Sequence, residues 1–253
     1  DAEGQVWYNS TSGTFKSAVA LAAWSSGSPL PTTKRFVMGT GIQTAALSAG
    51  GAGSPAFSNR RDTSEEYNGS GWTTTGNLGT ATYGAGAAGT QTASLVFGGS
   101  IPPTSYSTLT QSYDGSTWST PAAVMGSGRQ LPAGFGTQTS AVAAGGLEPG
   151  TPSAKTENYN GTAWTASGNM GTARYGLAGA GTQTAGVVTG GRPPSSGLTN
   201  TEAYDGSTWT AVSASNIGRQ YSAASGSQTA AITFGGGNPS QTNTAEEYDG
   251  TSW

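Results

Sequence analysis

The chain of 253 residues contains no cysteine and no histidine, and only 9% of its residues are charged. Without cysteine it forms no disulfide and offers no thiolate to a metal. Without histidine it lacks the most frequent general base and the most frequent metal ligand. A net charge of −3 provides no basic field to attract nucleic acid. We therefore predict a protein that is not an enzyme, uses no cofactor and no metal, and binds no nucleic acid.

Long apolar runs are absent as well. No segment approaches the roughly 20 apolar residues that span a bilayer, so we predict no membrane insertion. The chain begins at Asp1 without a visible signal peptide, and we interpret it as part of a longer chain. What the sequence does have is 42 glycines for tight turns, and 7 Trp, 10 Tyr and 6 Phe for a core.

An internal repeat dominates the sequence. Its first marker is a Tyr-Asp/Asn-Gly string that ends in Trp, its second is Gly-x-Gln-Thr, and its third is a diglycine. In every copy the second glycine of the diglycine follows the Gln by 8 residues. The tryptophans that end the strings are Trp72, Trp118, Trp164, Trp209 and Trp253, and Trp24 extends the series backwards. Five copies at intervals of 44 to 46 residues indicate a repeat architecture.

Each unit is predicted to form four short strands, A to D. In the fourth unit we expect them at 174–179, 184–189, 201–204 and 208–210. The Asp-Gly or Asn-Gly between C and D predicts a two-residue hairpin turn with positive φ at both positions. The Tyr of strand C and the Trp of strand D are expected to pack between neighbouring units. Four antiparallel strands repeated around an axis predict an all-β, five-bladed β-propeller.

The two chain ends are expected to close this ring. We predict a connecting segment at 1–18 and a single propeller at 19–253, with repeats of about 46 residues. A strand at about 20–26 is expected to complete the last blade, so that N- and C-terminal strands pair. Without that pairing an open sheet edge would remain, which is an aggregation hazard.

The diglycine, the following Tyr and the Trp at this spacing resemble a kelch repeat. The segments ARYGLAGAGTQTAGVVTGG (173–191) and TEAYDGSTWT (201–210) resemble kelch-like propellers of tailed, often marine, bacteriophage virions. The opening EGQVWYNSTSGTFK (3–16) resembles the segment that precedes such repeats in tail-fibre-type proteins. The repeats are shorter, poorer in charge and fewer than in a standard kelch domain. The resemblance implies a virion structural protein on the virion surface or otherwise extracellular.

The two faces of the predicted disc differ. The A–B and C–D turns have the same length in every blade, and we call their side the constant face. The D–A and B–C connections form the variable face, where 21, 19, 18, 18 and 17 residues separate the diglycine from the next Trp. Loops on a rigid scaffold are frequent binding sites, although surface loops also drift in length at little cost. Candidate ligand-binding residues in these loops are Arg60, Arg61, Tyr106 and Arg192.

A near-ring of cations is the second candidate site. The residues nine positions before each repeated Gln are Lys34, Thr82, Arg129, Arg174 and Arg219. If they circle the channel mouth, they could bind the anionic groups of acidic sugars or phosphates. The alternative is that each cation bonds carbonyls or carboxylates of the next blade. The repeated Gln is interpreted as structural, capping backbone groups of a neighbouring turn.

These observations favour a binding module over a catalyst. We expect a tail-fibre-like virion appendage domain for host attachment that recognises host cell-surface polysaccharide through the variable face. The alternatives are a purely structural propeller that contacts other virion proteins, and a secreted bacterial adhesin or lectin. A homo-oligomer within an appendage would suit the glycan-binding hypothesis, because weak single sites gain strength when linked.

Overall fold

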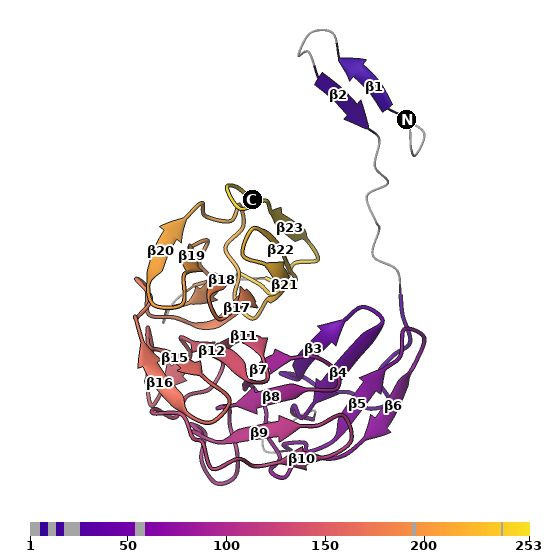
Figure 1. Ribbon diagram of the computed structural model, residues 1–253, viewed down its shortest axis with the longest axis vertical. Helices are drawn as coiled ribbons and strands as arrows, with labels where there is room; N and C mark the ends of the chain where they lie inside the picture. The colour runs from indigo at the N-terminus through magenta and orange to yellow at the C-terminus, as the bar shows by residue number, and fades with distance from the viewer. Residues whose placement is uncertain (1–5, 10–13, 18–25, 54–58, 194–195, 239) are drawn as a thin grey trace.

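The structure is a computed structural model that describes residues 6–9, 14–17, 26–53, 59–193, 196–238 and 240–253. The described residues form strands and turns, and none of them lies in a helix. Five small antiparallel sheets stand in a ring, so the predicted five-bladed β-propeller is confirmed (Figure 1). No helix in the described part is long and apolar enough to span a membrane.

The blades follow one another along the chain, each with its first strand nearest the axis (Figure 1). Blade one consists of β3 (Met38–Ile42), β4 (Ala45–Ala49), β5 (Ser64–Tyr67) and β6 (Trp72–Thr75). Blade two consists of β7 (Gly86–Gly89), β8 (Ser94–Phe97), β9 (Thr110–Tyr113) and β10 (Trp118–Ser119). Blade three consists of β11 (Ala133–Thr137), β12 (Ser140–Ala144), β15 (Thr156–Tyr159) and β16 (Trp164–Ser167). Blade four consists of β17 (Tyr175–Thr182), β18 (Ala185–Arg192), β19 (Thr201–Tyr204) and β20 (Trp209–Val212). Blade five consists of β21 (Ala223–Ser227), β22 (Ala230–Phe234) and β23 (Ala245–Tyr248).

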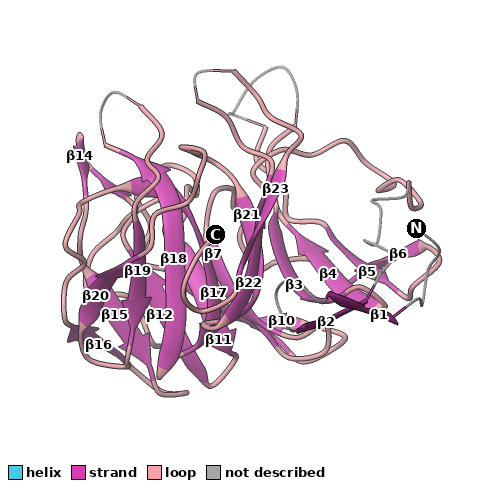
Figure 2. Ribbon diagram, turned by 90° about the horizontal axis from the view of Figure 1, so that it is seen from above, coloured by secondary structure: helices cyan, strands magenta, loops and turns pink. Residues whose placement is uncertain are grey.

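Two small hairpins complete the described structure. One pairs β13 (Leu147–Glu148) with β14 (Thr151–Pro152) in the B–C connection of blade three. The other pairs β1 (Val6–Asn9) with β2 (Thr14–Ser17) near the N-terminus. Figure 2 shows the longer connections, including the β13–β14 hairpin, rising from one side of the disc, whereas the other side carries short turns. The rising side is the variable face.

The inner strands are rich in glycine because the blades converge toward the axis. The ring of Phe97 on β8 lies against glycines of two blades. A Cβ at Gly86 would stand 2.4 Å from its Cε2 atom, and a Cβ at Gly134 would stand 2.9 Å from its Cζ atom. Any larger residue at these positions would displace the ring, so the small-residue runs are what allows the sheets to approach one another.

The C–D turn is longer than the predicted two-residue hairpin turn, so that prediction is wrong. Tyr113 pairs with Trp118, so four residues connect the strands. Only Gly115 has positive φ, at 96°. The Asp114 carboxylate accepts hydrogen bonds from the backbone N–H groups of Ser116 (2.9 Å) and Thr117 (2.7 Å). The acidic side chain therefore caps the turn, a role that an isolated Asp-Gly pair does not reveal.

The repeated aromatic residues pack between blades, as predicted. Within blade four, the rings of Tyr204 and Trp209 stack at 4.6 Å. The Trp209 indole N–H donates to the Thr156 hydroxyl of the preceding blade at 2.9 Å. Corresponding indole-to-hydroxyl bonds of 2.9 to 3.1 Å join Trp118 to Ser64, Trp164 to Thr110 and Trp253 to Thr201.

The repeated Gln also has the predicted structural role. The Gln183 amide donates to the backbone carbonyls of Ala141 (3.0 Å) and Tyr159 (2.8 Å) in the preceding blade. Gln91, Gln138 and Gln228 make the same pair of bonds. Each of these side chains thus fastens the A–B turn of one blade to strands B and C of the blade before it.

The junction between blades five and one differs from the other four. Clusters of buried apolar side chains fill the junctions from blade one through blade five. Blade five has three strands among the described residues, and most of β21 is exposed, as is Gln43 of blade one. The strand expected at about 20–26 lies outside the described residues except for Ser26, which is not in a strand.

Candidate functional site

The four cations of the predicted ring are buried inside the blades. The side chains of Lys34, Arg129, Arg174 and Arg219 are at most 1% exposed. Each is paired at 2.6 to 2.9 Å with a glutamate on strand C: Glu65, Glu157, Glu202 and Glu246. The partners belong to the same blade as the cation, not to the next one.

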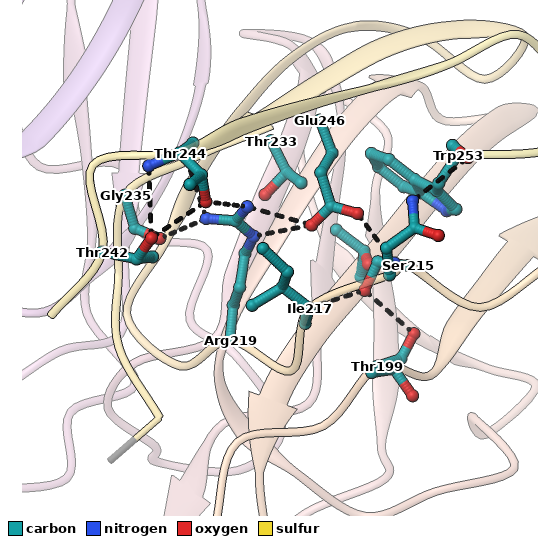
Figure 3. A network of polar contacts seen from close by, with 12 residues as sticks. Thr199, Ser215, Ile217, Arg219, Thr233, Gly235, Thr242, Thr244, Glu246 and Trp253 are labelled. Carbon is teal, nitrogen blue, oxygen red and sulfur yellow. Dashed lines mark hydrogen bonds and ion pairs between the residues drawn. The ribbon is translucent and has the colours of Figure 1, made fainter. Parts of the chain in front are cut away.

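Arg219 shows how completely such a cation is engaged (Figure 3). Its guanidinium donates to the carbonyls of Gly235 (2.8 Å) and Thr244 (3.0 Å) and to a carboxylate oxygen of Glu246 (2.9 Å). The second oxygen of Glu246 accepts the backbone N–H of Asn216 at 2.7 Å. Arg219 therefore ties together the D–A connection, the diglycine and strand C of its blade.

Blade two replaces the ion pair with a neutral pair at the same positions. Thr82 stands where the other blades have a cation, and Gln111 stands where they have Glu. The Gln111 amide donates to the Thr82 hydroxyl at 3.2 Å, and its oxygen accepts the N–H of Thr80 at 2.9 Å. Both members change together, which is typical of a structural pair. Burial lowers the pKa of Arg129 and Arg174, and the neighbouring glutamates oppose that shift.

The remaining candidates lie in the loops of the variable face. Arg60 donates through Nε and Nη2 to the Ser100 hydroxyl, the shorter bond being 3.0 Å, and its guanidinium lies 5.6 Å from the ring centre of Tyr83. The Arg192 guanidinium lies at the same distance from the ring of Tyr175. Arg61 lies against Gly53 of its own loop, and the partly buried Tyr106 packs its backbone against Gly128.

Two of these arginines flank a row of aromatic rings, which we call the aromatic arc. Tyr83 and Phe36 are 6.3 Å apart between ring centres, Phe36 and Tyr221 are 5.6 Å apart, and Tyr221 and Tyr175 are 6.3 Å apart. The arc crosses blades two, one, five and four in that order. It comprises Arg60, Tyr83, Phe36, Tyr221, Tyr175 and Arg192.

A strained backbone carries the centre of the arc. Phe36, Gly84, Leu131, Gly176 and Tyr221 occupy equivalent positions, one per blade, and all have φ between 51° and 61°. Successive members are hydrogen-bonded around the axis, each backbone N–H donating to the carbonyl of the preceding blade at 2.6 to 3.0 Å, from Tyr221 back to Phe36. Glycine adopts this left-handed conformation freely, whereas another residue loses about 1–2 kcal/mol there. Two blades use glycine, so the bulky residues of the other three are not required by the backbone.

The arc borders two cavities at the axial mouth of the variable face. One, of about 380 Å³, is lined by residues of all five blades, including Phe36, Leu131 and Tyr221. The second, of about 580 Å³, lies toward the B–C loop of blade five and shares Phe36 and Tyr221 with the first. These volumes fall in the range of ligand pockets. Gln220 and Ser222 flank Tyr221, and the buried atoms Gln220 Oε1 and Ser222 Oγ have no hydrogen-bond partner among the described residues.

The Tyr221 side chain is accessible from this mouth and uncharged. It is 41% exposed. Partial burial and the neighbouring Tyr175 raise the pKa of its hydroxyl. It therefore offers a ring face and a neutral hydroxyl to a ligand at ordinary pH.

Sequence reasoning identified the two arginines of the arc but missed its aromatic residues. The signal that could have found them is positional. Blades two and four contain the segments ATYG (81–84) and ARYG (173–176), in which Tyr83 and Tyr175 precede a glycine. At the position of that glycine, two residues after the buried cation, blade one has Phe36 and blade five has Tyr221. No protein-family model matches the chain, and no curated protein matches it significantly.

Proposed function

We propose that this propeller is a carbohydrate-binding module whose ligand lies on the aromatic arc. The supporting observation is the pair Phe36 and Tyr221, large aromatic residues kept in a left-handed conformation where two other blades have glycine. Strain of this kind is retained where function requires it. A sugar ring has an apolar face of C–H groups and a rim of hydroxyls, which match an aromatic ring face and nearby polar atoms.

The chemistry of the arc supports binding without catalysis. Its six side chains include no carboxylate, and so no acid–base pair of the kind that hydrolyses glycosides. The belt of backbone hydrogen bonds engages the amides at positions 84, 131, 176 and 221. A ligand is consequently held by ring faces and side-chain polar groups. Such a site fits recognition of a surface polysaccharide by many copies acting together.

The resemblance of the repeats to kelch-like phage proteins supports a place for this module. We propose that it belongs to a tail-fibre-like appendage of a tailed bacteriophage virion, where it attaches to the host surface. A propeller that serves only as a contact with other virion proteins is the alternative. It predicts that changes in the arc leave glycan binding absent or unaffected.

The test replaces Tyr221 by glycine, the residue that blades two and four use at this position. The change removes a central ring and leaves a backbone that glycine accepts without strain. Loss of a buried aromatic contact lowers affinity by about 2 kcal/mol or more, roughly 30-fold. The free energy of unfolding is expected to change by less than about 1 kcal/mol, because relief of strain offsets the lost ring contacts.

Leu131→Gly is the matched control, since Leu131 has the same backbone conformation and lines the smaller cavity but contributes no aromatic ring to the arc. Glycan-array binding, followed by calorimetry on the strongest ligand, should show a much larger loss for Tyr221→Gly than for Leu131→Gly. Equal binding by wild type and Tyr221→Gly would contradict the proposed site.

A further inference from the structure

The described charges in the loops and turns of the two faces differ in sign. The described loops of the variable face and the residues at their ends carry five basic residues, Arg35, Arg60, Arg61, Lys155 and Arg192. They carry two acidic residues, Asp62 and Glu148. The variable face thus has an excess of three positive charges in a protein whose net charge is −3.

The constant face has the opposite sign. Its C–D turns hold Asp114, Asp205 and Asp249, whose carboxylates accept backbone N–H groups of the turn. These hydrogen bonds lower the pKa of all three carboxyls, which keeps them charged. A polyanion is therefore repelled by one side of the disc and attracted by the other, where the arc lies.

The ends of the arc provide specific anchors within this field. A guanidinium has five N–H donors in a planar fork that matches a carboxylate. In Arg60, a single hydroxyl oxygen, that of Ser100, accepts from both Nε and Nη2, so its donors exceed the needs of that contact. Arg60 and Arg192 stand at opposite ends of four aromatic rings, and a ligand that reaches both covers the whole arc.

We infer that the ligand is an acidic polysaccharide, with sugar rings on the faces of Phe36 and Tyr221 and carboxylates on Arg60 and Arg192. This inference rests on the proposed carbohydrate-binding function and names its ligand class. A neutral glycan would contact the rings but would offer no carboxylate to either guanidinium group. Salt weakens the proposed complex, because its charged contacts are exposed to solvent.

The experiment compares polygalacturonate with the same polymer after reduction of its carboxyl groups, with neutral dextran as a reference. Biolayer interferometry measures affinity at low and at high salt. For the wild type we expect polygalacturonate to bind at least tenfold more tightly than its reduced form, and the difference to shrink in high salt. The double variant Arg60→Gln/Arg192→Gln should bind the two polymers equally, whereas Lys155→Gln, on the same face but outside the arc, should behave as wild type.

The outcomes separate this inference from the function on which it rests. Equal binding of native and reduced polymer by the wild type, both abolished by Tyr221→Gly, would overturn the acidic ligand while leaving carbohydrate binding in place. Failure of the wild type to bind polygalacturonate, or binding that Tyr221→Gly leaves intact, would overturn the inference at this site. Thermal unfolding of each variant checks that the Arg60–Ser100 contact is not required for folding. If the double variant unfolds, the single variants Arg60→Lys and Arg192→Lys replace it, because they keep the charge and remove the guanidinium fork. Each is expected to lower affinity for the native polymer and to leave affinity for the reduced polymer unchanged.

Discussion

The buried ion pair of Arg174 and Glu202 in blade four can be tested by a double-mutant cycle. The doubly substituted protein would carry the neutral residues that blade two already has at these positions. Arg174 donates to the carbonyls of Gly190 (2.9 Å) and Asn200 (2.7 Å) and to Glu202 (2.8 Å). The other oxygen of Glu202 accepts the N–H of Gly171 at 2.7 Å. Replacing Arg174 by Thr and Glu202 by Gln reproduces the neutral pair of blade two.

The expected magnitudes follow from burial. The Arg174 side chain is 0% exposed and that of Glu202 is 5% exposed. Arg174→Thr leaves a buried carboxylate with one backbone donor, and Glu202→Gln leaves a buried guanidinium without its counter-charge. Each single change should lower the free energy of unfolding by about 3–5 kcal/mol. For a domain of this size that corresponds to a fall in Tm of roughly 6–20 °C.

The two single losses in free energy of unfolding should not add up in the double variant, because it buries no unpaired charge. Its loss should be smaller than their sum by at least about 2 kcal/mol. Urea unfolding monitored by tryptophan fluorescence measures all four proteins. The solvent-exposed pair Lys155–Glu148 is the control, and Lys155→Thr should cost less than about 1 kcal/mol. Additive single effects, or a cost for Arg174→Thr no larger than that for Lys155→Thr, would refute the view that the buried cations are structural.

Two further predictions concern the repeated polar side chains. Gln183→Ala leaves two backbone carbonyls of the preceding blade without their donor and should lower the free energy of unfolding by about 1–3 kcal/mol. The same change at the exposed Gln43 should stay within about 0.5 kcal/mol in urea unfolding, and equal effects would contradict the fastening role. The turn carboxyls of Asp114 and Asp205 have their pKa lowered by backbone and hydroxyl donors, from an ordinary value of 3.8. Their contribution to stability is therefore complete above that pH and is lost as the pH falls below it. The double variant Asp114→Asn/Asp205→Asn keeps the cap, since Asn caps the same turn in blades one and three. Its free energy of unfolding should therefore fall less than that of the wild type between pH 5 and pH 2. An equal fall would show that other groups govern acid unfolding.

Local repetition explains why so much of the fold is readable from the sequence. In blade four, β19 coincides with the predicted strand C at 201–204. Strands β17 and β18 begin one residue after the predicted starts at 174 and 184 and run three residues past the predicted ends at 179 and 189. The outer strand begins at Trp209, one residue later than predicted. Strand ends shift because pairing partners decide where a ladder stops, and β17 and β18 pair along their lengths.

The candidate site was predictable only in part. The sequence predicts Arg60 and Arg192 as cations in variable loops. The four cations that it predicts at the channel mouth are instead buried in the blades. The repeat predicts where Arg174 lies along its blade, but it does not predict the direction of the side chain. That direction depends on Glu202, which is 28 residues away in the sequence.

The number of blades, the constant and variable faces and the positions of the aromatic contacts between blades can be predicted from the sequence, because each depends on a short motif that recurs at a fixed interval. The burial of the repeated cations and the arc of Tyr83, Phe36, Tyr221 and Tyr175 are visible only once the chain is folded. Those rings come from four blades, and their proximity is set by how the sheets converge on the axis. No local pattern in the chain encodes that convergence.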